Sequence, residues 1–205
     1  MARSAASDPI RDFKFVVEIH PTDRLRNLMG GGTGGAAITI GFAAISGLTV
    51  TNEVVSYREG GMNTHPHKLV GQSDYGAVTF SRGVFPTQNQ LYRWQQFMHT
   101  WNSGAANVNG SVTGANDYRC TIGVKVLDHP ASGSAYITDP TQLDQSIALP
   151  SMRLGYVLYN CWPGAFAMTD LNAASSGILV QQITVHHEGF QIVTSPTEFQ
   201  TALTA

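Results

Sequence analysis

Charged side chains are scarce in this chain: aspartate, glutamate, lysine and arginine together make up only 13% of its 205 residues. An ordinary globular domain has about 25%. With so few charges available, much of the surface has to be neutral. The cores of protein interfaces are depleted in charge in the same way. The composition therefore favours a protein that assembles with other chains over a low-charge monomer kept soluble by serine, threonine, asparagine and glutamine.

Several other features are absent from the sequence, and each absence argues against one class of protein. The formal net charge is −2, and no run of lysine or arginine forms the basic stripe that a nucleic-acid-binding protein needs. No apolar run approaches the roughly 20 residues that cross a bilayer, and Met1 to Asp8 lacks the apolar segment of a secretory signal. We therefore expect no membrane segment and synthesis in the cytoplasm. The two cysteines, Cys120 and Cys161, cannot make a disulfide framework, and we expect both to be small buried hydrophobes.

The residues that are present predict a mainly β protein. Hydrophobic residues make up 42% of the chain, enough for a core, and neither a repeat nor a linker divides residues 1–205. We predict a single-domain β-barrel or sandwich with two insertions, a glycine-rich one at about 21–37 and a polar one at about 129–150. Seven apolar, β-rich runs are predicted strands: 13–19, 38–45, 49–57, 77–82, 119–127, 153–162 and 178–187.

Two segments predict helices. Residues 88–101 form one flanking α-helix, with a capping box from Thr87 and Gln90 at its start. Its apolar residues recur at spacings of three and four, which makes one buried stripe of Leu91, Trp94, Met98 and Trp101. A second capping box, from Ser195 to Glu198 with Pro196 at the first helical position, predicts a short C-terminal helix.

The region around residues 49–74 does not follow a simple pattern. In the predicted strand 49–57 neither alternating face is apolar enough for a half-buried strand, as expected where a strand contacts other subunits or a polar channel. Residues 59–74 are polar and rich in turn residues around His65-Pro66-His67, and we predict a projecting loop.

Signs of chemistry are weak. Gly30 to Gly35 satisfies the letters of a dinucleotide-binding fingerprint, but the chain continues as a strand where that motif needs a helix. His65, His67 and His186 could bind a metal, although no acid or cysteine spacing completes a site, and ordinary histidines are the favoured interpretation. No nucleophile motif is present. We predict no catalytic residue, no cofactor and no metal, and therefore not an enzyme; the alternative is metal-dependent hydrolysis at the histidines.

Four short motifs in one order carry a resemblance: Ser46-Gly47-Leu48, Tyr57-Arg58-Glu59-Gly60-Gly61, Lys68-Leu69-Val70-Gly71 and Arg82-Gly83. The chain resembles the tail-tube proteins of contractile phage tails and bacterial contractile injection systems. Further similar pieces lie at 13–19, 159–163, 170–173 and 185–190, so the resemblance covers nearly the whole chain.

The resemblance implies a structural role. Such proteins form hexameric rings that stack into a hollow inner tube, so the implied partners are copies of itself, a surrounding sheath protein, baseplate and cap proteins, and effector cargo in the lumen as an option. It also implies synthesis in a bacterial cytoplasm and assembly into a phage tail-like particle, retained or released. Two alternatives stay open: a ring-forming carrier of effector cargo, and a cap or baseplate adaptor ring.

The resemblance also indicates which residues would make contacts. The projecting segment would reach a neighbouring subunit or ring, where charged groups make directional bonds and glycines allow close approach; its residues are Tyr57, Arg58, Glu59, Gly60, Gly61, Lys68 and Leu69. Polar positions opposite apolar ones on strands are candidates for the lumen, although they could face the sheath; these are Thr79, Ser81, Thr121, Lys125, Gln182 and Thr184.

Overall fold

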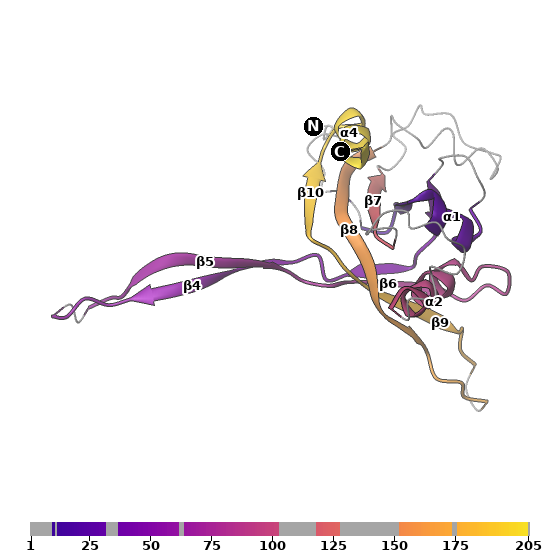
Figure 1. Ribbon diagram of the computed structural model, residues 1–205, viewed down its shortest axis with the longest axis horizontal. Helices are drawn as coiled ribbons and strands as arrows, with labels where there is room; N and C mark the ends of the chain where they lie inside the picture. Colours follow the sequence, from indigo (N-terminus) through magenta and orange to yellow (C-terminus); the bar gives the residue numbers. More distant parts are fainter. Residues whose placement is uncertain are drawn as a thin grey trace, which may run out of the picture.

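Two β-sheets that share one long strand form the body of the protein, and a two-stranded ribbon projects from it (Figure 1). The computed structural model describes residues 10, 12–31, 37–61, 64–102, 118–127, 152–173 and 176–204. In chain order the elements are β1 (Phe15–Pro21), α1 (Asp23–Met29), β2 (Ile38–Ile40), β3 (Ala44–Ser46), β4 (Val50–Tyr57), β5 (His67–Tyr75), β6 (Val78–Gly83), α2 (Gln90–Asn102), β7 (Cys120–Leu127), β8 (Met152–Met168), β9 (Val180–His186), β10 (Gly189–Val193) and α4 (Pro196–Thr204). The prediction of a mainly β domain is confirmed, in the sandwich-like form and not as a closed barrel.

The long strand β8 joins the two sheets. Its first part pairs with β7 and β10, and its second part pairs with β9, so the first sheet runs β2-β1-β7-β8-β10 and the second runs β3-β6-β9-β8. Asn160 has a left-handed backbone (φ 53°), and the register with β9 shifts between Pro163 and Ala165. The sequence-based prediction that this strand ends at Pro163 is wrong, because the irregularity accommodates the residue that lacks an N–H and the strand continues to Met168.

The main core lies between the two sheets and α2. Side chains from β1 and β7 meet those from β6 and β9, and α2 closes the layer with Leu91, Trp94 and Phe97. The predicted helix and its apolar stripe are confirmed at Leu91 and Trp94, and the Trp94 indole donates a 3.2 Å hydrogen bond to the carbonyl of Tyr118. The helix begins at Gln90 after Asn89, so the capping box expected from Thr87 and Gln90 is wrong.

The predicted C-terminal helix is confirmed as α4. A second, smaller core lies under this helix. Phe199 of α4 packs against the outer face of β7 and β8, with Val157, Val193 and Met152 around it. Lys125 was predicted to lie on the polar face of its strand, but the structure buries it, together with Gly123 on the same side of β7, because α4 covers this face.

Two other strand predictions needed correction, those at 38–45 and at 178–187. Residues 38–45 form two short strands, β2 and β3, in different sheets. The glycine-rich insertion begins with α1, whose Thr22 caps the N-terminus and whose Gly30 (φ 85°) ends it. The strand predicted at 178–187 is followed by one more, β10. The predicted insertion at 129–150 lies outside the described residues. None of the described helices is long and apolar enough to cross a membrane.

Candidate assembly surfaces

The β4–β5 hairpin, called the arm below, extends far from the body (Figure 1). Every residue of β4 is exposed, as is every residue of β5 except Gly71. The prediction that this region projects is confirmed, but the predicted loop is wrong over residues 67–74, which form strand β5. An isolated two-stranded hairpin is at best marginally stable in water, so an arm of this length needs a partner.

A β-bulge explains why the arm shows no simple alternation. Two residues of β5, Gly71 and Gln72, lie opposite the single residue Glu53 of β4. A Cβ atom at position 71 would lie 3.0 Å from the Cβ of Glu53, so glycine suits this crowded position. The extra residue shifts the register, so strict alternation along β5 cannot be read across the bulge.

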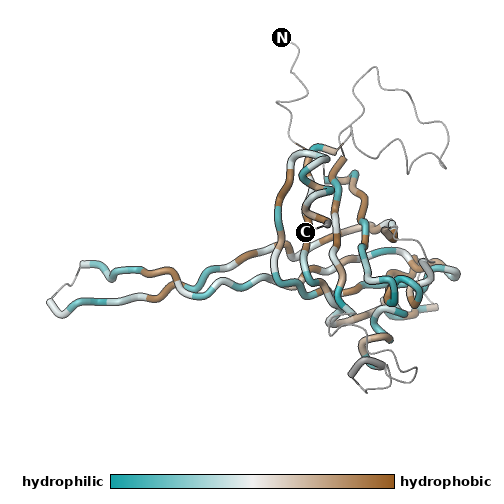
Figure 2. Tube along the Cα trace, turned by 45° about the horizontal axis from the view of Figure 1, so that its top comes forward, coloured by the Kyte–Doolittle hydropathy of each residue, from teal (hydrophilic) through white to brown (hydrophobic). Residues whose placement is uncertain are grey.

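Beyond the bulge the arm is apolar on both faces. Val54 pairs with Val70, the next pair is Val55 with Leu69, and successive pairs point to opposite faces. These four residues, called the mid-arm band, are between 47% and 82% exposed. Figure 2 shows hydrophobic residues on both strands midway along the arm. Exposed apolar surface of this kind marks an interaction site.

The seven predicted contact residues all lie on the outer half of the arm. Leu69 belongs to the mid-arm band, Tyr57 pairs with His67, and Lys68 pairs with Ser56. Arg58, Glu59, Gly60 and Gly61 follow at the exposed turn, where Gly61 has a φ of 94° that favours glycine. The structure thus brings these residues together in solvent, and their contact with another subunit stays a prediction.

An aromatic cluster that the sequence analysis did not predict attaches the arm to the body. The ring of Tyr75, the last residue of β5, lies 5.7 Å from the His187 ring and 6.1 Å from the Phe190 ring. Beside them His186 stacks on Trp162 at 4.7 Å. Gly76 also donates a 3.0 Å backbone hydrogen bond to Thr49, which ties the two strands at their root.

Hydrogen bonds to the carboxylate of Glu188 stabilise the turn that carries His187. Glu188 accepts hydrogen bonds from Asn160, at 2.7 Å, and from Arg119. These two bonds lower the pKa of Glu188 below its ordinary value. His186, one of the three histidines considered as metal ligands, lies at this root, whereas His65 and His67 lie near the far end of the arm, where His67 pairs with Tyr57. In the part of the chain that the structure describes, no group of three or more histidine, cysteine or acidic side chains could hold a metal ion.

Four of the six lumen candidates form one cluster on the second sheet. Thr79 pairs with Thr184, with their hydroxyl oxygens 3.3 Å apart, and Ser81 pairs with Gln182. The flanking strands add small residues at the same registers, on the face turned away from the core. We call this surface the polar face; it comprises Ala44, Ser46, Thr79, Ser81, Ala165, Ala167, Gln182 and Thr184.

The other two lumen candidates lie elsewhere. Thr121 is on β7 of the first sheet, opposite His20 of β1. Lys125 is 7% exposed; its Nζ lies 2.5 Å from a carboxylate oxygen of Glu18 and 5.1 Å from the centre of the Phe199 ring. Burial raises the pKa of Glu18, but hydrogen bonds and charges from His20 and Lys125 lower it more, so that it lies below the ordinary value. Lys125 therefore belongs to the packing under α4 and is left out of the polar face.

The second sheet ends in two unlike edges. Among the described strands β3 has a neighbour only in β6, and the segment of β8 after Pro163 has a neighbour only in β9. Unpaired edges expose main-chain donors and acceptors that can pair with another chain. Because the two edges differ, one edge of a subunit can pair with the other edge of a second copy, which is a head-to-tail contact.

A projecting arm, an exposed polar face and open sheet edges define a structural protein that assembles with other chains. Residues 11–191 match the family model of the T4-like virus tail tube protein gp19, and the chain belongs to this family. The resemblance given by the sequence motifs is thereby confirmed.

Solved structures share the fold. A chain of the anti-feeding prophage (AFP) baseplate, 6-fold symmetrised, matches with a TM-score of 0.64 and 18% identity, over 92% of this chain and 97% of that one. A chain of the sheath-tube complex of an extracellular contractile injection system, PVC, in the extended state, gives 0.61 and 19%, over 93% and 95%. A chain of the AFP tube-terminating cap gives 0.58 and 21%, over 95% of each. Among proteins with curated functions, none matches this chain in sequence.

Proposed function

We propose that this chain is the repeating subunit of the inner tube of a contractile injection system or phage-like tail, and that its work is assembly and not catalysis. The second sheet carries this proposal, because its two unlike edges let copies join β3 to β8 in a closed ring. Six copies per ring follow the 6-fold symmetry stated for the similar AFP baseplate. Rings of this kind then stack into a hollow tube.

The same geometry supports a proposal for the inner surface of the ring. The first sheet, α1 and α2 all lie on the core side of the second sheet. If the second sheets of the subunits join into a closed ring, these elements have to lie on the outside of that ring. The polar face is uncovered, so it would line the lumen. Its hydroxyls, amide and methyl groups give a wall without charged side chains, suited to passage of cargo and not to tight binding. Thr121 lies on the other sheet and is not part of this wall.

The arm supplies contacts between subunits. Its mid-arm band is apolar on both faces, so full burial needs protein on both sides, as between subunits of adjacent rings. The charged pair Arg58 and Glu59 beyond it would orient the contact through charge-assisted hydrogen bonds. Surrounding sheath protein, baseplate and cap proteins are the further partners, by analogy with the complexes in which the similar chains occur.

Synthesis in a bacterial cytoplasm and incorporation into a particle, retained or released, follow from the same proposal. One alternative keeps specific support: similar chains occur in a baseplate and in a tube-terminating cap, so an adaptor or cap ring is a second candidate function. A carrier of effector cargo, the other alternative, would form the same ring, but its rings would not stack into a tube.

Native mass spectrometry of the purified chain tests the ring. We expect hexamers and multiples of six subunits. A second measurement tests the lumen: Ser81→Cys, labelled with a maleimide-linked gold cluster, is expected to place the gold along the tube axis in electron micrographs. Cys120 and Cys161 are buried, so the new cysteine is the accessible one among those described. Monomers and dimers alone, or gold on the outer wall, would contradict the proposal.

A further inference from the structure

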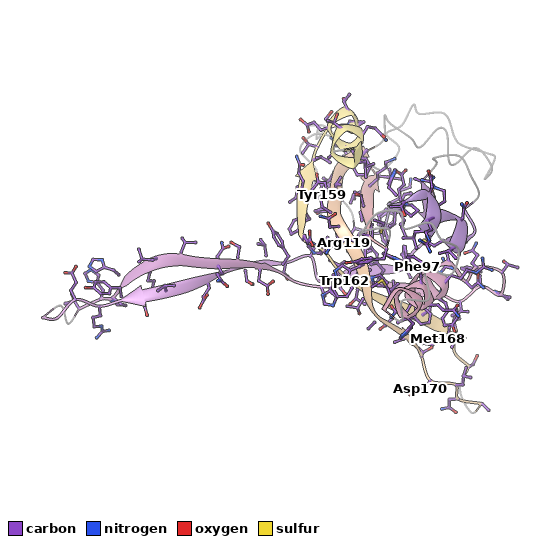
Figure 3. All side chains as sticks on the ribbon, viewed as in Figure 1. Phe97, Arg119, Tyr159, Trp162, Met168 and Asp170 are labelled. Carbon is purple, nitrogen blue, oxygen red and sulfur yellow. The ribbon has the colours of Figure 1, made fainter. Side chains whose placement is uncertain are left out.

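A second projection, at the turn between β8 and β9, exposes apolar side chains that neither the core nor the arm uses. Leu171 is 86% exposed, Ile178 is 85% exposed and Met168 is half exposed. We call these three residues the β8–β9 tip. Figure 3 shows Met168 and Asp170 on this projection, away from the arm. The motif Asp170-Leu171-Asn172-Ala173 belongs to it, and no surface described above accounts for that motif.

Paired strands hold the tip in place. Met168 pairs with Gln181, and the next residues are joined by two hydrogen bonds, from Thr169 N–H to the Val180 carbonyl at 2.9 Å and from Val180 N–H to the Thr169 hydroxyl at 3.1 Å. The exposed Leu171 and Ile178 therefore each lie two residues from a hydrogen-bonded strand pair. Large apolar side chains this exposed beside a paired strand end indicate a docking surface.

The strand directions place the tip relative to the ring. If copies join through the edges of the second sheet, the strands run steeply along the ring axis, as in any closed sheet, where they tilt by about 35–45°. Gly83 pairs with Val180 at the tip end of β6 and β9, and Val78 pairs with Val185 at the other end, beside the arm root. The tip and the arm root therefore lie at opposite rims of one ring.

We propose that the β8–β9 tip is the axial docking element, and that it binds the arm of a subunit in the next ring, against the mid-arm band and Val50. This rests on the proposed function. The tip offers exposed apolar side chains at one rim, and the arm, which is rooted at the other rim, offers exposed apolar side chains along its length. Such a contact is head-to-tail and never closes, so it extends a stack of rings without limit.

The double variant Leu171→Ser with Ile178→Ser tests the tip. We expect folded subunits and normal rings, with stacking lost or needing at least about tenfold more protein, because the docked apolar groups are gone. Gly177→Ser is the matched control: it adds a polar side chain to the same turn, and a Cβ there meets nothing within 4 Å. Unchanged stacking in the double variant would overturn the proposal. Loss of rings or of the folded subunit would also overturn it, since the tip would then serve the ring or the fold.

A mixing experiment tests the receiving surface. Val54→Ser with Val70→Ser removes half of the mid-arm band and is expected to give rings that do not stack. Equal amounts of preformed tip-variant rings and arm-variant rings should then form pairs of rings and nothing longer, because each mixed pair restores one intact contact. No pairs, or an arm variant that still stacks or fails to form rings, would show that the tip does not dock on the arm. Failure of the wild-type chain to form rings would instead overturn the proposed function.

Discussion

Phe199 of α4 lies directly over Gly155 of β8. A Cβ atom on this glycine would stand 2.5 Å from the Cδ2 atom of the ring, closer than real side chains approach. Gly123 on the neighbouring strand is almost as crowded, with the ring at 2.6 Å. The two glycines make the recess that seats the C-terminal helix, so the outer face of the first sheet is covered within the monomer.

Replacing Gly155 with alanine should therefore destabilise the protein. Phe199 has to move off the sheet, and overpacking of this kind costs about 2 kcal/mol. Urea unfolding of Gly155→Ala measures the loss. Gly83→Ala is the control, since a Cβ at that strand position meets nothing within 4 Å. Equal stability of both variants with the wild type would show that α4 does not depend on this recess.

The ion pair beneath α4 makes stability depend on pH. The folded-state pKa of Glu18 lies below its ordinary value, so its stabilising contribution is present above the unfolded pKa and is lost as the pH falls through the folded one. Glu18→Gln leaves the buried Lys125 without its partner and is expected to cost about 3 kcal/mol at pH 7. The difference from the wild type should shrink as the pH falls from the unfolded-state pKa of glutamate, about 4.3, through the lower folded-state pKa, where the wild-type carboxylate takes up its proton. A difference that stays constant from pH 7 to pH 3 in chemical unfolding experiments would contradict this role.

The two thiols should be unreactive until the chain unfolds. Cys120 and Cys161 are opposite each other on β7 and β8 and buried, which raises the pKa of Cys161 to about 12 and that of Cys120 well above its ordinary value. We expect native protein at pH 8 to resist iodoacetamide, and unfolded protein to be alkylated at both positions, as measured by mass spectrometry. The unfolded thiols ionise near pH 9, so folded stability should fall as the pH rises from 9 towards 12. Rapid alkylation of the native protein would mean that the strands open readily at this pair.

Exchange of the charges near the end of the arm should damage assembly and leave the subunit folded. In Arg58→Glu with Glu59→Arg the net charge is unchanged, but directional bonds to another subunit no longer match. Because both residues are exposed, the melting temperature of the monomer should shift by less than about 2 °C. Asp12→Lys with Lys14→Asp, a charge exchange away from the arm that also leaves the net charge unchanged, is the matched control. Normal tubes from the double variant, seen by electron microscopy, would remove Arg58 and Glu59 from the interface.

The sequence predicted most clearly those elements that are specified by local pattern. The stripe around Leu91 and Trp94 defines α2, and Pro196 marks the start of α4. Burial was harder to predict, because it depends on neighbours distant in sequence. Lys125 alternates like a solvent-facing residue and is buried only because α4 returns to cover it.

The assembly surfaces, too, could be predicted from the sequence only where a local pattern specifies them. The motif from Tyr57 to Gly61 marked the arm, and polar alternation found Thr79, Ser81, Gln182 and Thr184 on one face. Strand β5 was missed because the bulge at Gly71 breaks its alternation. The aromatic root of the arm was missed because Tyr75 and His187 come from distant segments, and their contact is a property of the fold.

Cryo-electron microscopy of the purified chain, at increasing concentration, tests the central claim most directly. We predict closed rings of six subunits, joined through β3 and the end of β8, that stack into tubes with Thr79 and Thr184 facing the lumen. Isolated monomers at the highest concentration, or rings whose polar face lies on the outside, would contradict it.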